Sequence, residues 1–215
     1  MKRKIRSLRA WVPVILVVTA LLQGSSTAAS AAEIDSGVAE SRSVQFISHD
    51  CLAALQSASV KTGMSSQDAV HQCKRTATLK VGAVRKIAPA QLAAQSEAPP
   101  SLVSAAAAGI VYGRPFSQTI AQITDQETQN GYLYYDGSYS WVKSYYRGYR
   151  GSHSCWVNYA VGYSIEMTQC DDWGVRSSTN AAHMGMTVHL LGTAFPVSWH
   201  EDYYVYISRT GSYWQ

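Results

Sequence analysis

The stretch from Tyr132 to Cys170 contains the densest group of aromatic residues in this chain. Turns that contain glycine, such as Asp136-Gly137, interrupt it, and β-branched residues accompany the rings. Aromatic and β-branched side chains are favoured on the pleated surface of a strand, and short runs of them between glycine turns are typical of antiparallel sheets. This stretch therefore predicts an all-β domain.

The same pattern extends over residues 110–215, where Asp136-Gly137 is the clearest hairpin-turn signal. The segment Met184–Leu190 alternates in side-chain type as a half-buried strand does. Because no long helical periodicity follows residue 110, we expect an antiparallel β-sandwich or small barrel. The predicted strands are Gln118–Ile123, Tyr132–Tyr135, Tyr139–Tyr145, Cys155–Val161, Tyr163–Gln169, His183–Thr193 and Tyr203–Ser208.

The N-terminus predicts export. Five basic residues precede an apolar run, Trp11–Leu22, which is followed by small residues and an A-x-A site at Ala29-Ser30-Ala31. This order is that of a secretory signal peptide, and the run is shorter than the roughly 20 residues that span a bilayer. We therefore expect a signal peptide over 1–31, a secreted product and no stable membrane anchor once the signal is removed.

Removal of this signal changes the net charge. The full chain has 18 Lys and Arg against 14 Asp and Glu, a net charge of +4. Five of the basic residues lie in the signal, which leaves 13 against 14, a net charge of −1. The basic balance thus belongs to the signal, and it does not favour a nucleic-acid partner.

Residues 32–86 predict a small helical segment. Ser48 can cap a helix that ends near Gly63, and Ser65 with Asp68 resembles a capping box that starts a second helix, whose apolar face continues to Ala77. Residues 87–109 are rich in Ala, Pro and Ser and predict a linker. The helical segment is either a pro-region or a permanent N-terminal part.

Four cysteines in an exported chain indicate two disulfides, for which three pairings exist. In a helical hairpin turning at Gly63, Cys51 and Cys73 would lie at nearly the same level, which favours their pairing. Cys155 would then pair with Cys170. The sequence leaves open whether these two face each other in a hairpin or belong to one long strand bent at Gly162.

The aromatic cluster is also the candidate binding surface. Exposed Tyr and Trp side chains on a sheet can stack on sugar rings or pack against a partner, although about half of such a cluster must point into the core. The candidate binding residues are Tyr139, Trp141, Tyr145, Tyr146, Tyr149 and Arg147.

Other chemistry has weaker support in the sequence. No two cysteines have zinc-ligand spacing, and His200-Glu201-Asp202 lacks the second histidine of a metalloprotease helix. We therefore expect no metal, no cofactor and no catalytic residue. The acids Asp125, Glu127, Asp171 and Asp172 could serve a carboxylate-based hydrolase, but solvated loop acids are the commoner case.

Four short motifs resemble a set of uncharacterised small secreted β-rich proteins of actinobacteria: Tyr134–Gly137, Tyr159–Tyr163, Gly192–Val197 and Gly211–Gln215. The resemblance covers the C-terminal region and implies secretion and a β fold, without any catalytic residue. The sequence as a whole predicts an extracellular binding module for carbohydrate or a cell-wall surface. The alternatives are a secreted toxin or bacteriocin-like protein matured from a precursor, and a hydrolase.

Overall fold

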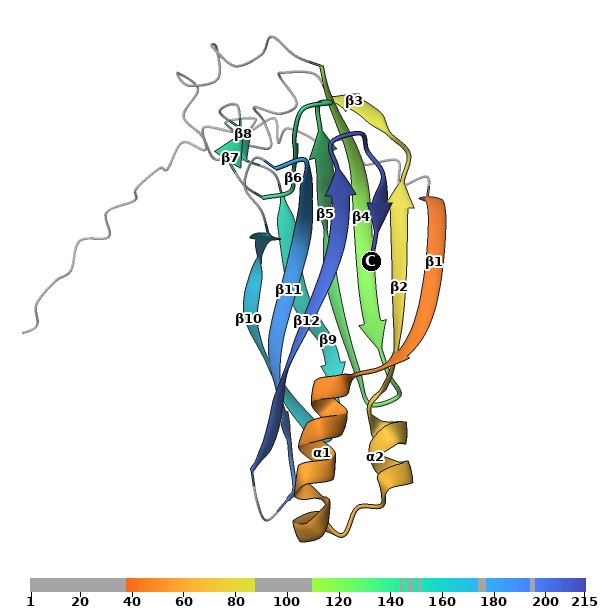
Figure 1. Ribbon diagram of the computed structural model, residues 1–215, viewed down its shortest axis with the longest axis vertical. Coiled ribbons are helices and arrows are strands. Elements are labelled where there is room, and N and C mark those ends of the chain that lie inside the picture. Colours follow the sequence, from red (N-terminus) through yellow and green to blue (C-terminus); the bar gives the residue numbers. More distant parts are fainter. Residues whose placement is uncertain are drawn as a thin grey trace, which may run out of the picture. The chain divides into compact units, whose positions relative to one another are not determined.

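The computed structural model describes residues 38–87, 110–143, 145–146, 149–150, 152–173, 177–193 and 196–215. The predicted signal peptide and residues 88–109 of the predicted linker lie outside this part of the chain. The described residues belong to one compact unit, and they form two principal antiparallel sheets (Figure 1). The predicted all-β antiparallel architecture is thus confirmed.

The larger sheet has seven strands, in the order β1-β2-β4-β5-β6, with β3 pairing with β4 and β9 pairing with β5. Its strands are β1 (Val38–Ile47), β2 (Lys74–Gly82), β3 (Arg85–Ile87), β4 (Val111–Ala121), β5 (Asp125–Tyr135), β6 (Ser140–Trp141) and β9 (His153–Ala160). The hairpin between β5 and β6 turns at Asp136-Gly137, as the sequence predicts. There, Gly137 has a φ of 88°, and the Asp136 backbone N–H donates to the Tyr139 carbonyl at 3.1 Å.

The smaller sheet has four strands in the order β10-β11-β12-β13. They are β10 (Tyr163–Trp173), β11 (Thr179–Leu190), β12 (Val197–Ser208) and β13 (Tyr213–Trp214), and β7 (Tyr145–Tyr146) pairs with β8 (Tyr149–Arg150) as a separate ribbon. The strands β11 and β12 are longer than predicted and begin several residues earlier. Their pairing is continuous from Thr179↔Ser208 to Leu190↔Val197.

The two sheets face each other across an apolar core. Alternate side chains of β2 and β4, including Leu79 and Phe116, pack against Val205 and Ile207 of β12. Towards the other end, Met184, Met186 and Trp199 pack with Ile120 and with the inner side of the first helix. Because inward residues alternate with outward ones, each sheet keeps a second face that points away from this core.

Two helices close one end of this core (Figure 1). They are α1 (His49–Thr62), capped by Ser48 and ended by Gly63 at a φ of 69°, and α2 (Ser66–Gln72), capped by Ser65. The capping signals are confirmed, but the prediction that the second helix continues to Ala77 is wrong. The chain enters β2 at Lys74, where Ala77 is an inward strand residue. Among the described residues, neither helix is long and apolar enough to cross a membrane.

Residues 38–87 are not purely helical, which corrects the prediction of a small helical segment over residues 32–86. The strand β1 precedes α1, and β2 lies between β1 and β4 in the larger sheet. A chain that began at residue 110 would lack β1, β2 and β3, and β4 would lose its pairing along Phe116–Ala121. We therefore treat residues 38–87 as part of the folded unit.

Both predicted disulfides are confirmed. Cys51 is bonded to Cys73, which ties α1 to the end of α2, and Cys155 is bonded to Cys170. The second bond joins β9 of the larger sheet to β10 of the smaller one, and the chain passes between the sheets at Val161-Gly162 with a φ of 80° at the glycine. Strand β9 pairs with β5 and strand β10 pairs with β11, so the two strands belong to different sheets. The alternation of apolar residues through Gly162 therefore continues from one sheet into the other. Two disulfides indicate an oxidising, extracellular environment.

Candidate functional site

The predicted aromatic cluster divides between core and surface. Trp141 is 1% exposed and stacks on Tyr134 at 5.6 Å, so its assignment to the binding surface is wrong. Tyr139 is exposed, as a binding residue must be. The side chains of Tyr145, Tyr146 and Tyr149 lie outside what the structure describes, as does the whole of Arg147.

A row of stacked rings lies on the outer face of the smaller sheet. His183 stacks on Tyr204 with ring centroids 4.5 Å apart, Tyr204 on Tyr206 at 5.7 Å, and Tyr206 on Trp214 at 5.4 Å. We call these four residues the aromatic stack. The strand alternation of β12 places Tyr204 and Tyr206 on one face, and the register of β11 and β13 brings the other two rings beside them.

The geometry of the stack decides which ring can accept a ligand. The interplanar angles are 6°, 24° and 8°, so neighbouring rings are nearly parallel and each inner ring has a neighbour on both sides. A ligand can therefore stack only on a ring at an end of the row. Trp214 is such an end, and it is 43% exposed.

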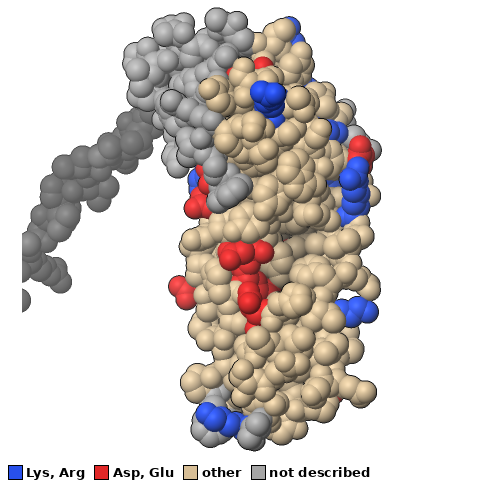
Figure 2. Space-filling model, in the orientation of Figure 1, with Lys and Arg blue, Asp and Glu red and all other residues tan. Residues whose placement is uncertain are grey.

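Carboxylates and histidines continue this face beyond the stack. His183 Nε2 lies 2.7 Å from Asp202 Oδ1, and His183 Nδ1 lies 3.1 Å from Asp171 Oδ1. His200 Nε2 is 3.3 Å from the same oxygen of Asp202. Figure 2 shows acidic side chains gathered near the middle of the visible face, which is the side of the smaller sheet in Figure 1.

Gly185 allows this arrangement. It lies opposite Asp202 on β12, and a Cβ built on it would be 3.0 Å from Asp202 Oδ1 and 3.2 Å from the Gln169 Cβ. These contacts are tighter than ordinary van der Waals packing, so a side chain here would displace the carboxylate that the two histidines contact.

A groove of about 280 Å³ lies between β1 of the larger sheet and β12 of the smaller sheet. Its wall includes ring surfaces, the carboxylate of Asp202 and two amides, and Gln118 Nε2 donates to Gln215 Oε1 at 3.2 Å. The lining residues are Val44, Phe46, Ala77, Gln118, Asp202, Tyr203, Tyr204, Tyr206 and Gln215. The groove thus shares Tyr204 and Tyr206 with the aromatic stack.

A larger pocket, of about 630 Å³, lies at the helical end between α2 and the turn from β4 to β5. Its lining is mostly amide, hydroxyl and basic groups, including Gln45, Lys74 and Thr124. Tyr163 is the one Tyr, Trp or Phe residue in the lining, and it is 7% exposed. The residues that line this pocket therefore offer no exposed Tyr, Trp or Phe ring on which a sugar could stack.

A buried ionic cluster lies between the sheets. Arg75 on β2 donates to Asp125 on β5 and, at 3.3 Å, to Glu201 on β12. Trp199 Nε1 donates to Glu201 at 2.8 Å, and the Tyr203 hydroxyl also donates to that carboxylate. Arg75 and the two carboxylates are at most 3% exposed, so no substrate can reach them.

Glu127 adds a further carboxyl group to this cluster and is fully buried. Burial raises the pKa of Glu127 to about 9, and the nearby negative charge of Asp125 adds to the effect. Glu127 is therefore protonated at neutral pH. Asp125 and Glu127 are core residues, which corrects the expectation that they are solvated loop acids.

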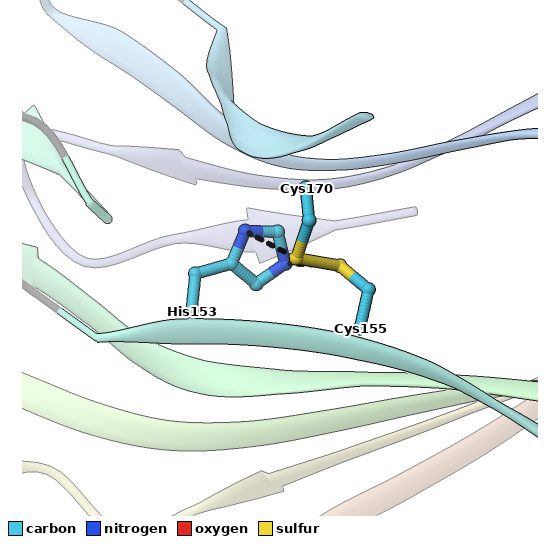
Figure 3. Close-up of side chains that lie close together, drawn as sticks. All are labelled: His153, Cys155 and Cys170. Atoms are coloured by element: carbon cyan, nitrogen blue, oxygen red, sulfur yellow. Dashed lines mark hydrogen bonds between the residues drawn. A yellow bond between two sulfur atoms is a disulfide. The ribbon is translucent and has the colours of Figure 1, made fainter. Parts of the chain in front are cut away.

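His153 and the second disulfide form a compact group (Figure 3). The ligand atoms of His153, Cys155 and Cys170 lie within 4.8 Å of one another, but both sulfurs are bonded in the disulfide and offer no thiolate to a metal. His153 Nε2 lies 2.8 Å from Gln129 Oε1, and burial lowers the pKa of His153 to about 4. The disulfide therefore joins the two sheets beside a neutral histidine.

Sequence reasoning missed the aromatic stack and the ionic cluster for different reasons. The stack had a local signal, the alternation of Tyr204 and Tyr206 in β12, but its other members come from β11 and β13. Arg75 and Glu201 are 126 positions apart in the chain, and each looks like an ordinary surface charge until the sheets are assembled.

Comparison with known proteins gave no match: no family model, no curated protein and no solved structure corresponds to this chain.

Proposed function

We propose that this protein is a secreted glycan-binding module, and that the Trp214 end of the aromatic stack and the adjoining groove form its binding site. The observation that carries the proposal is the exposed Trp214 ring at the end of the stack, next to a groove that combines rings, amides and a carboxylate. A sugar presents an apolar ring face together with several hydroxyls. Aromatic faces and convergent polar groups match both parts.

The charge of the surface narrows the ligand class. Glu166, Asp171 and Asp202 all lie on the outer face of the smaller sheet, and a strongly anionic polymer would be repelled there. A neutral glycan, or one that carries amino groups, fits this surface better.

Truncating Trp214 tests the site. In Trp214→Ala the stacking platform is lost, and loss of a central aromatic contact costs about 2 kcal/mol or more, roughly a 30-fold weaker Kd. Tyr206→Phe removes only a hydroxyl and should change the Kd by less than about fivefold. The measurement is calorimetric titration of the full secreted chain with soluble neutral and amino-sugar oligosaccharides, accompanied by pull-down with cell-wall preparations.

Tyr139→Ala is the matched control, because Tyr139 is similarly exposed and belongs to the aromatic cluster that the sequence indicated. If binding is lost in Tyr139→Ala and kept in Trp214→Ala, the proposed site is wrong. Failure of the wild-type chain to bind any glycan would remove the proposal itself. If the wild type releases sugar and Asp202→Asn does not, the protein is a hydrolase and the binding proposal is wrong.

A further inference from the structure

The outer face of the larger sheet carries a regular field of hydroxyl and amide side chains. Five strands, in the order β1-β2-β4-β5-β9, pair in a register that aligns their outward residues in three transverse rows. The rows are Ser41, Lys80, Ser117, Asn130 and Ser154; Ser43, Thr78, Thr119, Thr128 and Trp156; and Gln45, Thr76, Ala121, Gln126 and Tyr159. We call these fifteen positions the hydroxyl array.

The spacing of the array follows from sheet geometry. Neighbouring strands are about 4.8 Å apart, and outward residues along one strand repeat at about 6.6 Å. Hydroxyl groups therefore lie on a two-dimensional grid. Thr128 is buried, whereas the other fourteen side chains are at least partly exposed.

Hydrogen bonds fix the middle row. Ser43 and Thr78 share a hydrogen bond of 2.9 Å, Thr119 and Thr128 share one of 3.3 Å, and the Thr128 hydroxyl donates to Asn158 Oδ1 at 2.8 Å. A hydroxyl offers one proton and two lone pairs, so side chains held in this way retain capacity to bond outward. The row is thus oriented before any ligand arrives.

The array is almost free of charge. Lys80 is the only charged residue among its fifteen positions, whereas about a quarter to a third of an ordinary soluble surface is charged. The outer face of the smaller sheet, by comparison, carries three acids, Glu166, Asp171 and Asp202. Solvation alone does not require an uncharged hydroxyl grid.

Two aromatic rings stand at the β9 edge of the array. Trp156 is 38% exposed and Tyr159 is 42% exposed. The Tyr159 hydroxyl donates to the Gln122 carbonyl at 3.1 Å, which limits the positions of that ring. A nearly uncharged field bordered by exposed rings complements a neutral chain of sugars.

We propose that the hydroxyl array is a second binding surface, for an uncharged extended polysaccharide lying flat across the strands, with Trp156 stacking on a sugar ring. This surface faces away from the aromatic stack, and the proposal stands independently of the groove. A module with both surfaces would join two polymer chains.

A charge inserted into the array tests the proposal. The full secreted chain is incubated with insoluble cellulose or chitin at about 0.15 M salt, and the bound fraction is measured. Thr78→Lys introduces an ammonium group into the middle row, and Trp156→Ala removes the stacking ring. Each should weaken retention at least tenfold. The matched control is Thr187→Lys, a half-buried threonine on the outer face of the smaller sheet.

The outcomes separate the two surfaces. Retention unchanged in both array variants, or lost equally in Thr187→Lys, overturns the proposal, as does failure of the wild type to bind either polymer. Trp214→Ala should keep its retention on insoluble polymer, so the failure of one site does not imply the failure of the other. The wild type could also fail to bind polymer and yet inhibit ice recrystallisation, with Thr78→Lys losing that inhibition. This result would identify ice as the ligand of the array and would also overturn the proposal. Thermal unfolding of each variant confirms that the fold is intact.

Discussion

Replacing Arg75 by methionine should greatly lower the free energy of unfolding of this protein. The substitution removes the only cation of the buried ionic cluster and leaves Asp125 and Glu201 as buried carboxylates without their partner. Removal of one member of a buried ion pair costs about 3 to 5 kcal/mol, a large share of the total stability of an ordinary domain. The measurement is urea unfolding of the secreted chain, followed by tryptophan fluorescence.

A compensating variant separates the charge effect from a packing effect. Arg75→Met combined with Asp125→Asn and Glu201→Gln leaves no buried ion in these three positions, and it should recover more than half of the lost stability. Arg42→Met is the matched control, since Arg42 forms an exposed ion pair with Glu40 and such pairs contribute little. If the triple variant is no more stable than Arg75→Met, the loss arises from packing rather than from unpaired charge.

Stability should fall as the pH rises above about 6.5. The folded chain holds a proton on Glu127, whose pKa is raised from 4.5 to about 9, whereas the unfolded chain releases that proton above pH 4.5. Between these values the folded state binds one proton more, so the free energy of unfolding decreases by about 1.4 kcal/mol per pH unit. The contribution of Glu127 is thus fully present below pH 4.5 and is lost as the pH approaches 9.

His153 opposes this slope at lower pH. Its pKa is lowered from 6.5 to about 4, so between these values the unfolded chain binds the extra proton and stability rises with pH. The two slopes cancel between about pH 4.5 and pH 6.5. Above pH 6.5 both states have a neutral His153, and the loss caused by Glu127 is no longer opposed.

The Glu127→Gln variant checks this assignment. It keeps the shape of a protonated carboxyl group and cannot ionise, so its free energy of unfolding should be nearly constant from pH 6.5 to pH 8.5, where the wild type loses about 3 kcal/mol. Glu166→Gln, an exposed acid on β10, should keep the wild-type slope. A Glu127→Gln variant with the full wild-type slope would show that another group controls the pH dependence.

Local signals predicted the parts of this fold that depend on few neighbouring residues. Ser48 and Gly63 marked the ends of α1 because capping is chemistry within a single turn, and Asp136-Gly137 marked a hairpin for the same reason. The β class followed from composition. The pairing of the cysteines also followed, because few arrangements of four cysteines agree with their spacing.

The conformation of strand β2 could not be predicted from local signals. Its residues follow α2 directly, and Ala69, Cys73 and Ala77 also fit a helical period, so the local pattern did not distinguish helix from strand. Pairing with β1 on one side and β4 on the other decides the matter. The same pairing brings Arg75 to Asp125 and aligns Thr78 with Ser43 and Thr119.

The sequence by itself determined the class of the fold, the helix ends, the hairpin at Gly137 and the two disulfides, because each depends on composition or on short spacings. Only the tertiary structure decided that Trp141 is core, that Trp214 ends a stack of rings, and that three rows of mainly hydroxyl and amide side chains share one face. The physical reason is register: a shift of one residue in a strand reverses every side chain between core and solvent. Register is set by the partners of a strand and by the core between the sheets, and those partners come from distant parts of the chain.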